Sequence, residues 1–310
     1  MQYILGVDIG GTTVKMGLFE ETGKLLEKWE IQTRTKEKGK FILSDVAESL
    51  TGVLRARAID TASVIGIGCG VPAPVSKTGY VEKSANLGWE DYEAGETLHR
   101  LTGLKVSIGN DANVAALGEM WQGGGKGYKD LIVMTLGTGV GGGIIVDGGC
   151  VTGAHGSGGE IGHITVNPHE TRACGCGRKG CLEQYASATG IAHMADQKMQ
   201  KETRKTVLKP HGNTAKDVFD AVKQGDVVAK EVAESFGKAL GKAAANLAVV
   251  TDPEVFVIGG GVSKAGPVLL DYVEKAFQEN AFYGNRNTKF VLATLGNDAG
   301  ITGAARLVLK

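Results

Sequence analysis

The chain has 310 residues, of which 42% are hydrophobic and 22% charged, and its 34 basic and 34 acidic side chains give a formal net charge of zero. This length is long for one hydrophobic core and suits two lobes. The balanced charge argues against a nucleic-acid binder or a polybasic membrane binder, and no apolar segment approaches the length of a membrane span. We therefore expect a soluble cytoplasmic protein. The 48 glycines, roughly twice the usual share, cluster in turns, as where backbone approaches phosphates closely.

Strands and helices alternate in the first part of the chain, which predicts an α/β fold. Short apolar runs predict strands, and apolar residues spaced three and four apart predict helices. The expected strands are residues 3–8, 14–19, 25–32, 64–70 and 106–109, and the expected helices are residues 41–57, 89–101 and 111–122.

The second part of the chain repeats the opening pattern and then becomes more helical. A strand, a glycine turn and a strand at 131–146 echo residues 4–19 at an offset of about 127 residues, which predicts two related lobes. A loop or hinge is expected at the glycine run 123–127. Thr214 and Asp217 form a cap-like start for one later helix, and Asp226 can cap the next. The remaining expected strands are residues 254–258 and 290–294, and the remaining helices are 182–199, 214–223, 226–250, 267–279 and 299–309.

Three glycine-rich turns each follow an expected strand, at residues 10–13, 137–143 and 259–261. Glycine lets backbone N–H groups face an anion, and the carboxyl ends of strands are where open α/β sheets bind ligands. One such turn alone is equally consistent with a plain hairpin, and the spacing fits neither the Rossmann nor the P-loop pattern. Three together suit a nucleotide.

Asn110 and Asp111 lie at an expected strand-to-helix junction. One interpretation is helix capping, because Asn and Asp are favoured N-cap residues and the same Asn-Asp-Ala triplet recurs at 297–299. The other makes Asp111 a general base between the lobes. Spacing alone leaves both open.

A cluster of metal-binding residue types spans 163–181 and contains His163, Cys174, Cys176 and Cys181. Three sulfurs and one imidazole are a known tetrahedral zinc set. The alternative, three buried thiols, fits poorly with the surrounding Gly, Arg and Lys residues. His155 and His169 compete with His163 for the fourth position. Two carboxylates that flank the cluster, Glu160 and Glu183, are not needed by the metal and can serve a ligand. The two remaining cysteines, Cys69 and Cys150, are expected to be buried thiols.

Seven motifs together resemble the ROK family (repressor, open reading frame, kinase) over essentially the whole chain: DIGGTTVK, GVPAPV, NDANVAALGE, LGTGVGGGI, GGEIGH, CGCGRKGCLE and IGGGVS. One departure is Ala73, where the family more often has glycine. The resemblance implies a two-lobed actin/hexokinase/Hsp70-like ATPase fold of the ribonuclease H-like type. Residues 1–112 plus 298–310 would form a small α/β lobe, and residues 113–297 a large α/β lobe with the zinc loop and a homodimer surface.

The resemblance also implies a function, the ATP-dependent phosphorylation of glucose to glucose 6-phosphate, with Mg²⁺ and a structural Zn²⁺. Within this class the substrate could instead be fructose, mannose, N-acetylmannosamine or N-acetylglucosamine. A second alternative is a sugar-responsive repressor, which would carry a helix-turn-helix before the kinase-like part, whereas the first expected strand begins at residue 3. A third is a zinc-stabilised sugar-binding protein without catalysis.

The family motifs assign roles to individual positions of this chain. Asp111 matches the catalytic base, and His163 would hold zinc with one ring nitrogen and face the sugar with the other. Asp8 would lie near magnesium. The matching sugar ligands are Asn86, Asn110, Asp111, Glu160, His163 and Glu183; the matching phosphate-loop positions are Asp8, Gly10, Gly11, Thr12, Thr138 and Gly139; Gly260 and Gly261 match the adenosine side.

Overall fold

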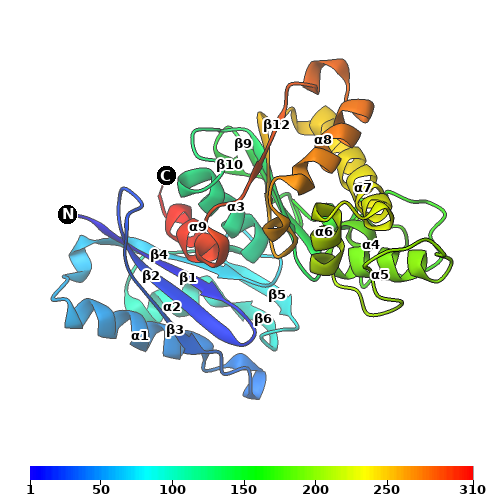
Figure 1. Ribbon diagram of the computed structural model, residues 1–310. Helices are drawn as coiled ribbons and strands as arrows, with labels where there is room; N and C mark the ends of the chain where they lie inside the picture. Colours follow the sequence, from blue (N-terminus) through cyan, green and yellow to red (C-terminus); the bar gives the residue numbers. More distant parts are fainter. Residues whose placement is uncertain (310) are drawn as a thin grey trace.

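The computed structural model describes residues 1–309 and shows two mixed β-sheets with helices on both faces (Figure 1). The first sheet has five strands in the order β3-β2-β1-β4-β7. Strand β1 pairs antiparallel with β2 and parallel with β4. Its strands are β1 (Tyr3–Ile9), β2 (Thr13–Glu20), β3 (Leu25–Gln32), β4 (Val64–Val71) and β7 (Val106–Asn110).

The second sheet repeats this arrangement with the order β10-β9-β8-β11-β12. Strand β8 pairs antiparallel with β9 and parallel with β11, as β1 does with β2 and β4. The strands are β8 (Leu131–Leu136), β9 (Val140–Val146), β10 (Gly149–Cys150), β11 (Val255–Gly259) and β12 (Lys289–Leu292). Since β1 ends at Ile9 and β8 at Leu136, the echo of about 127 residues in the sequence is confirmed as two related halves.

Helices cover both faces of the first sheet. Helix α1 (Ile42–Ala56) buries one face, including Val46 and Leu50, because its apolar residues recur every three or four positions. It shares a core with α2 (Ala94–Thr102) and one side of the sheet. Helix α9 (Ala299–Leu307) packs on the other side against β1 and β2. We call this unit the small lobe.

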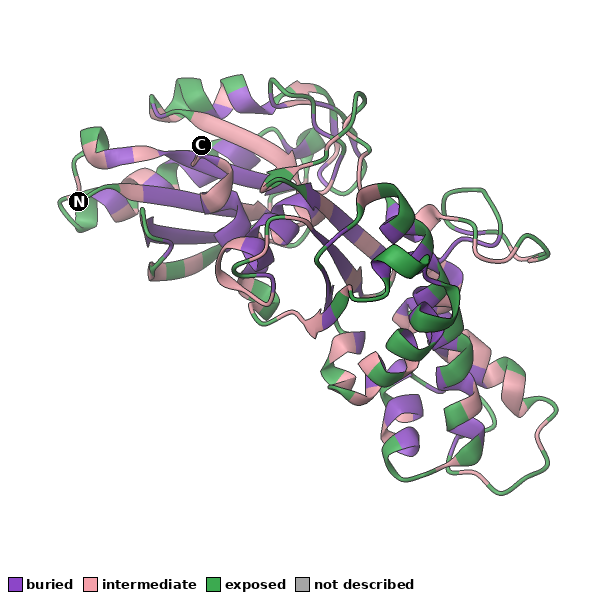
Figure 2. Ribbon diagram, turned by 90° about the horizontal axis from the view of Figure 1, so that it is seen from above, coloured by how far each residue is buried: buried purple, intermediate pink, exposed green. Residues whose placement is uncertain are grey.

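The second sheet belongs to a larger unit, which we call the large lobe. Its main core lies between the sheet and a group of helices that Figure 2 shows with alternating buried and exposed positions. The expected capping box of Thr214 and Asp217 is present, and Asp226 caps the next helix through Ala229 N–H. The helices of this group are α4 (Glu183–Ala186), α5 (Ala188–Met199), α6 (Ala215–Lys223), α7 (Val227–Thr251) and α8 (Val268–Asn280).

Two helices lie side by side between the sheets (Figure 1). Helix α3 (Asp111–Gln122) packs on the large-lobe sheet, while α9 packs on the small-lobe sheet. Their backbones approach so closely that a Cβ on Gly303 would lie 1.6 Å from the carbonyl oxygen of Val114. The expected lobe boundaries, after residues 112 and 297, fall at the starts of α3 and α9, and we keep this division as a proposal. Lys310, assigned to the small lobe, lies outside the described residues.

The structure corrects two expected helices. Residues 89–101 are not one helix, because Trp89–Glu93 forms strand β6, paired with β5 (Tyr80–Ser84), and α2 begins only at Ala94. Strand β6 forms because β5 pairs with it, and the spacing of apolar residues within 89–101 gives no sign of this partner. Residues 182–199 form two helices, since the side chain of Ser187 accepts the N–H of Gly190 and starts a new helix, α5.

Two smaller expectations are also corrected. Asp298 makes no side-chain cap for α9; its carboxylate pairs with Lys28 Nζ at 2.7 Å instead. Cys69 is fully buried as expected, whereas Cys150 is only half-buried on β10. Short 3-10 helices complete the described secondary structure: η1 (Glu37–Gly39), η2 (Thr61–Ser63), η3 (Ile161–His163), η4 (Val262–Ala265), η5 (Tyr283–Asn285) and η6 (Gly296–Asp298). Within residues 1–309, every helix is too short or too polar to cross a bilayer.

Candidate active site

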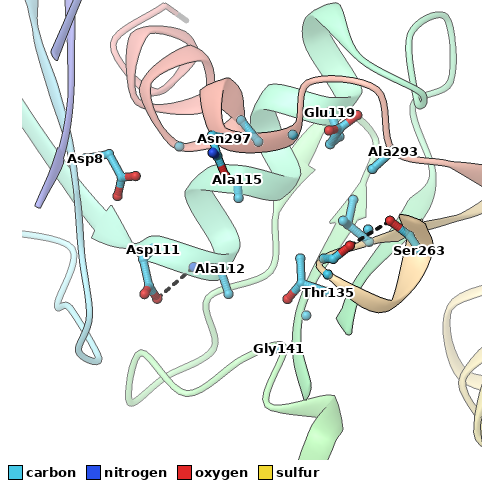
Figure 3. Close-up of a pocket in the computed structure, with 18 of the residues that line it drawn as sticks. Asp8, Asp111, Ala112, Ala115, Glu119, Thr135, Gly141, Ser263, Ala293 and Asn297 are labelled. Carbon is cyan, nitrogen blue, oxygen red and sulfur yellow. Dashed lines mark hydrogen bonds between the residues drawn. The ribbon is translucent and has the colours of Figure 1, made fainter. Parts of the chain in front are cut away.

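A cavity of 780 Å³ opens between the lobes (Figure 3). It is bounded by Asp8 near the end of β1, Asp111 at the start of α3, Thr135 on β8 and Gly259 at the end of β11. The carboxyl ends of parallel strands from both sheets therefore meet here, as expected for a ligand site in an α/β protein.

Asp111 is placed in the cavity by the cap of its helix. The Asn110 side chain accepts the N–H groups of Ala112 and Asn113 at 3.0 and 3.2 Å, so the capping interpretation holds for Asn110. Asp111 is then the first helical residue, and its Oδ1 accepts the N–H of Ala112 at 2.8 Å (Figure 3). Burial raises the pKa of Asp111, the Ala112 hydrogen bond opposes this, and the nearby charge of Glu160 adds to the rise.

A second carboxylate, Asp8, faces the same cavity (Figure 3). Burial raises the pKa of Asp8; Lys15, opposite it on β2, lowers it, and the charge of Asp111 raises it further. Gly300 is closely fitted to this side chain, since a Cβ there would lie 2.4 Å from Asp8 Oδ2 and would displace the carboxylate. Two half-buried carboxylates facing one polar cavity provide hard oxygen ligands of the kind that Mg²⁺ prefers.

Some residues of the glycine-rich segments line the cavity, and others lie next to it. Gly260 and Gly261 line it, and Gly260 must be glycine because its φ is +83° and a Cβ would lie 2.5 Å from Leu136 O. Gly141 and Gly142, at the start of β9, also line the cavity. The predicted positions Gly10, Gly11, Thr12, Thr138 and Gly139 lie on the adjoining turns and are not among the lining residues.

The four expected zinc ligands come together. One ligand atom from each of His163, Cys174, Cys176 and Cys181 lies within 4.8 Å of every other. The Cys176 and Cys181 sulfurs are 3.7 Å apart, and Cys174 Sγ is 3.9 Å from His163 Nδ1. Sulfurs at about 2.3 Å from a tetrahedral zinc would stand about 3.8 Å apart, close to the observed separation, so the residues fit this metal. This group contains neither His155 nor His169.

The remaining expected sugar ligands occupy different positions. Glu160 lines the cavity, just before η3 and His163. Glu183, the first residue of α4, lies outside the lining, where its Oε2 accepts the Val140 N–H at 3.1 Å. Asn86 also lies outside the lining. It lies next to the first glycine turn, since a Cβ on Gly11 would be 3.5 Å from the backbone carbonyl oxygen of Asn86.

The cavity also contains residues that the sequence reasoning missed, among them Lys15, Glu119, Ser263 and Asn297. Lys15 could have been found from the hairpin register, because a tight turn at residues 9–14 sets it opposite Asp8. Glu119 is in the quoted motif NDANVAALGE, but nothing in the helical pattern distinguishes it from a surface carboxylate.

The comparisons with known proteins agree with this geometry. Residues 4–310 match the ROK family. The chain is 44% identical to a glucokinase of Halalkalibacterium halodurans, covering 99% of this chain and 95% of that protein. It is similar to the crystal structure of a ROK hexokinase from Thermus thermophilus, with a TM-score of 0.83 and 30% identity over 99% of this chain and 97% of the other.

A third relative is the crystal structure of a ROK family glucokinase from Streptomyces griseus in complex with glucose and AMPPNP. Its TM-score is 0.75, and the identity is 34% over 98% of each chain. The two-lobed α/β architecture is that of the actin/hexokinase-like ATPases, and the chain belongs to the ROK family.

Proposed function

We propose that the chain is an ATP-dependent glucokinase that transfers the γ-phosphoryl group of ATP to the 6-hydroxyl of glucose. The observation that carries this is the pair of half-buried carboxylates, Asp8 and Asp111, in one cavity between the lobes, bordered by glycine turns. The named activities of the relatives, glucokinase and hexokinase, support the same reaction.

Asp111 acts as the general base. The proton of the glucose 6-hydroxyl moves to its carboxylate, the hydroxyl oxygen forms a bond to the γ-phosphorus, and the bond from that phosphorus to the β,γ-bridging oxygen breaks. ADP leaves with the electron pair. Burial raises the pKa of Asp111, which brings the base closer to the working pH and makes it a better proton acceptor.

Asp8 would hold Mg²⁺, which neutralises phosphate charge when it is bound. The backbone around Gly141 and Gly142 faces the phosphates. Two turns do so as well, that of Gly10, Gly11 and Thr12 and that of Thr138 and Gly139. The backbone around Gly260 and Gly261 faces the adenosine. Glu160 accepts hydrogen bonds from sugar hydroxyls, and the Asn110 amide can donate or accept them. Asn86, His163 and Glu183 approach the sugar from neighbouring segments.

The cysteine cluster shapes the loop that carries the sugar ligands. His163, Cys174, Cys176 and Cys181 would hold Zn²⁺, which fixes the backbone on either side of the cluster. Glu160 and Glu183 flank it and gain fixed positions at little entropic cost. Closure of the lobes would exclude water, which otherwise competes as phosphoryl acceptor. We also infer a homodimer through the large lobe and a cytoplasmic location.

An ADP-release assay over a panel of hexoses tests the function. Glucose should give the highest kcat/KM, ahead of fructose, mannose, N-acetylmannosamine and N-acetylglucosamine. A higher value for another hexose would replace glucose as substrate. Sugar binding without ADP release on any member of the panel would support a non-catalytic sugar sensor instead.

A further inference from the structure

Glu119 is a buried carboxylate in the last half of α3, with only 2% of the residue exposed. Its Oε2 accepts the backbone N–H groups of Gly124 at 2.8 Å and Thr294 at 3.1 Å, and its Oε1 accepts that of Leu295 at 3.0 Å. The ion pairs among residues 1–309 do not include it. A buried carboxyl group that accepts three backbone N–H groups is costly to remove, because these donors would be left unsatisfied.

The glycine run after α3 is shaped around this carboxylate. A Cβ on Gly123 would lie 2.0 Å from Glu119 Oε2, and one on Gly124 would lie 2.4 Å from the carbonyl oxygen of Leu292. The glycines therefore let the chain turn tightly over Glu119 and against the end of β12. The sequence predicts a loop or hinge at residues 123–127, and the structure gives the physical reason for its glycines.

Glu119 lies where the two connections between the lobes meet. Helix α3 leads from β7 of the small lobe to β8 of the large lobe, and residues 293–298 lead back from β12 to α9. Glu119 belongs to the first connection and holds the second through Thr294 and Leu295. Its hydrogen bonds thus fix one connection against the other.

The same residue lines the cavity together with Leu292, Ala293, Thr294 and Asn297. In Figure 3, Glu119 lies beside Ala293, on the side away from Asp8 and Asp111. Gly260 and Gly261, to which we assign the adenosine, also line the cavity. All of residues 292–297 except Leu295 line the cavity, and Ala293 lies against the end of β11, where a Cβ on Gly259 would be 3.0 Å from the Ala293 Cβ. This segment is therefore a wall of the cavity on the side of Gly260 and Gly261, the nucleotide side.

We propose that Glu119 is a positioning residue that holds residues 292–297 in place as a wall of the nucleotide site, and so controls nucleotide affinity independently of sugar affinity. This inference rests on the proposed function for the identity of the ligand. Glutamine at position 119 has one acceptor oxygen instead of two, so its NH₂ group would face at least one of the three N–H donors.

The test is Glu119→Gln, with Asp196→Asn as matched control. Asp196 also accepts three hydrogen bonds, from Gly212 N, Asn213 N and Asn213 Nδ2, but it joins α5 to a loop of the large lobe and does not line the cavity. Calorimetry gives the Kd for ADP with Mg²⁺ and, separately, the Kd for glucose; thermal unfolding gives the Tm of each variant.

Glu119→Gln should weaken ADP binding about tenfold, the effect of losing one hydrogen bond to a charged group, with the glucose Kd within about twofold of the wild type. Asp196→Asn should lower Tm and leave both Kd values unchanged. An unchanged ADP Kd in folded Glu119→Gln protein overturns the proposal, and so does an equal loss of ADP and glucose affinity.

If Glu119→Gln fails to fold, Glu119→Asp is measured in its place, with the same expected and contradicting results. Aspartate keeps the carboxylate, but its side chain is one methylene shorter, so its oxygens no longer reach all three N–H groups. The ADP titration requires no turnover. A protein that binds ADP but phosphorylates no hexose would refute the proposed function and still test the role of Glu119.

Discussion

The carboxylate of Glu183 accepts a hydrogen bond from the backbone N–H of Val140, with 3.1 Å between Oε2 and N. Its other oxygen, Oε1, lies 3.6 Å from Cys174 Sγ. A Cβ on Gly139 would lie 2.2 Å from Oε2, so the turn is closely fitted to this side chain. Glu183 thus joins the cysteine cluster to the glycine turn after β8. A sugar hydroxyl that binds Glu183 would compete with Val140 for the carboxylate.

We expect this competition to couple the two substrates. Glucose that draws Glu183 away releases the Val140 N–H for a phosphate oxygen, so glucose should tighten nucleotide binding. In Glu183→Ala the amide is free from the start, and the ADP Kd should no longer depend on glucose. Calorimetric titration of ADP with and without saturating glucose measures the coupling. The same glucose dependence in the variant and the wild type would contradict it.

Asp111→Asn should strongly slow phosphorylation while preserving the fold. Loss of a general base lowers kcat by about 10²–10⁴-fold, and the glucose Kd should stay near the wild-type value because the amide can still hydrogen-bond the 6-hydroxyl. The assay is ADP release at saturating glucose and ATP, together with calorimetry of glucose binding. Near-normal turnover would refute the assignment of Asp111 as the base.

The same variant should be at least as stable as the wild type at pH 7. The pKa of Asp111 is raised above its ordinary 3.8 in the folded chain, chiefly by burial, so the native state binds the proton more tightly than the unfolded state. Stability therefore falls as pH rises from 3.8 through the raised pKa, and the penalty is complete above it. Thermal unfolding should show a higher Tm for Asp111→Asn at pH 7 and a smaller difference in acid. A lower Tm at pH 7 would contradict this.

The acid limb of the kcat/KM profile should have its midpoint above the ordinary pKa of an aspartate, since Asp111 must be deprotonated to accept a proton. Glu160 raises the pKa of Asp111 through its charge, so Glu160→Gln should move this midpoint to lower pH even though it weakens sugar binding. Initial rates at low glucose across the pH range give the profile. A midpoint that moves upward would exclude this effect of Glu160.

Removal of the proposed zinc should loosen the segment from Glu160 to Glu183, to which we assign sugar ligands. Cys176→Ser is expected to abolish binding of the proposed zinc and to lower Tm by about 5 °C or more, because the remaining three ligands would no longer be held together by the metal. Elemental analysis, thermal unfolding and glucose titration measure the effect. Cys150→Ser, outside the cluster, serves as control and should bind as much zinc as the wild type. A metal-free protein with wild-type Tm and glucose Kd would show that the cluster has no structural role.

Much of the fold could be predicted because its signals are local. The two strand–turn–strand units, the capping box of Thr214 and Asp217 and the N-cap Asn110 each depend on residues a few positions apart. The start of the helix expected at residues 89–101 was wrong, because residues 89–93 form β6, whose pairing with β5 is not reported by helical periodicity, whereas the rest is helix α2.

The sequence by itself determined the residue types of the site: an acid after a strand, glycine turns and three cysteines within eight residues. Only the tertiary structure selected His163 over His155 and His169, because η3 brings its ring to the sulfurs. Only the tertiary structure, likewise, brought Glu119 to the N–H groups of Thr294 and Leu295. Local sequence sets backbone conformation and cap chemistry, whereas contacts across 175 residues exist only once both lobes have packed around α3 and α9.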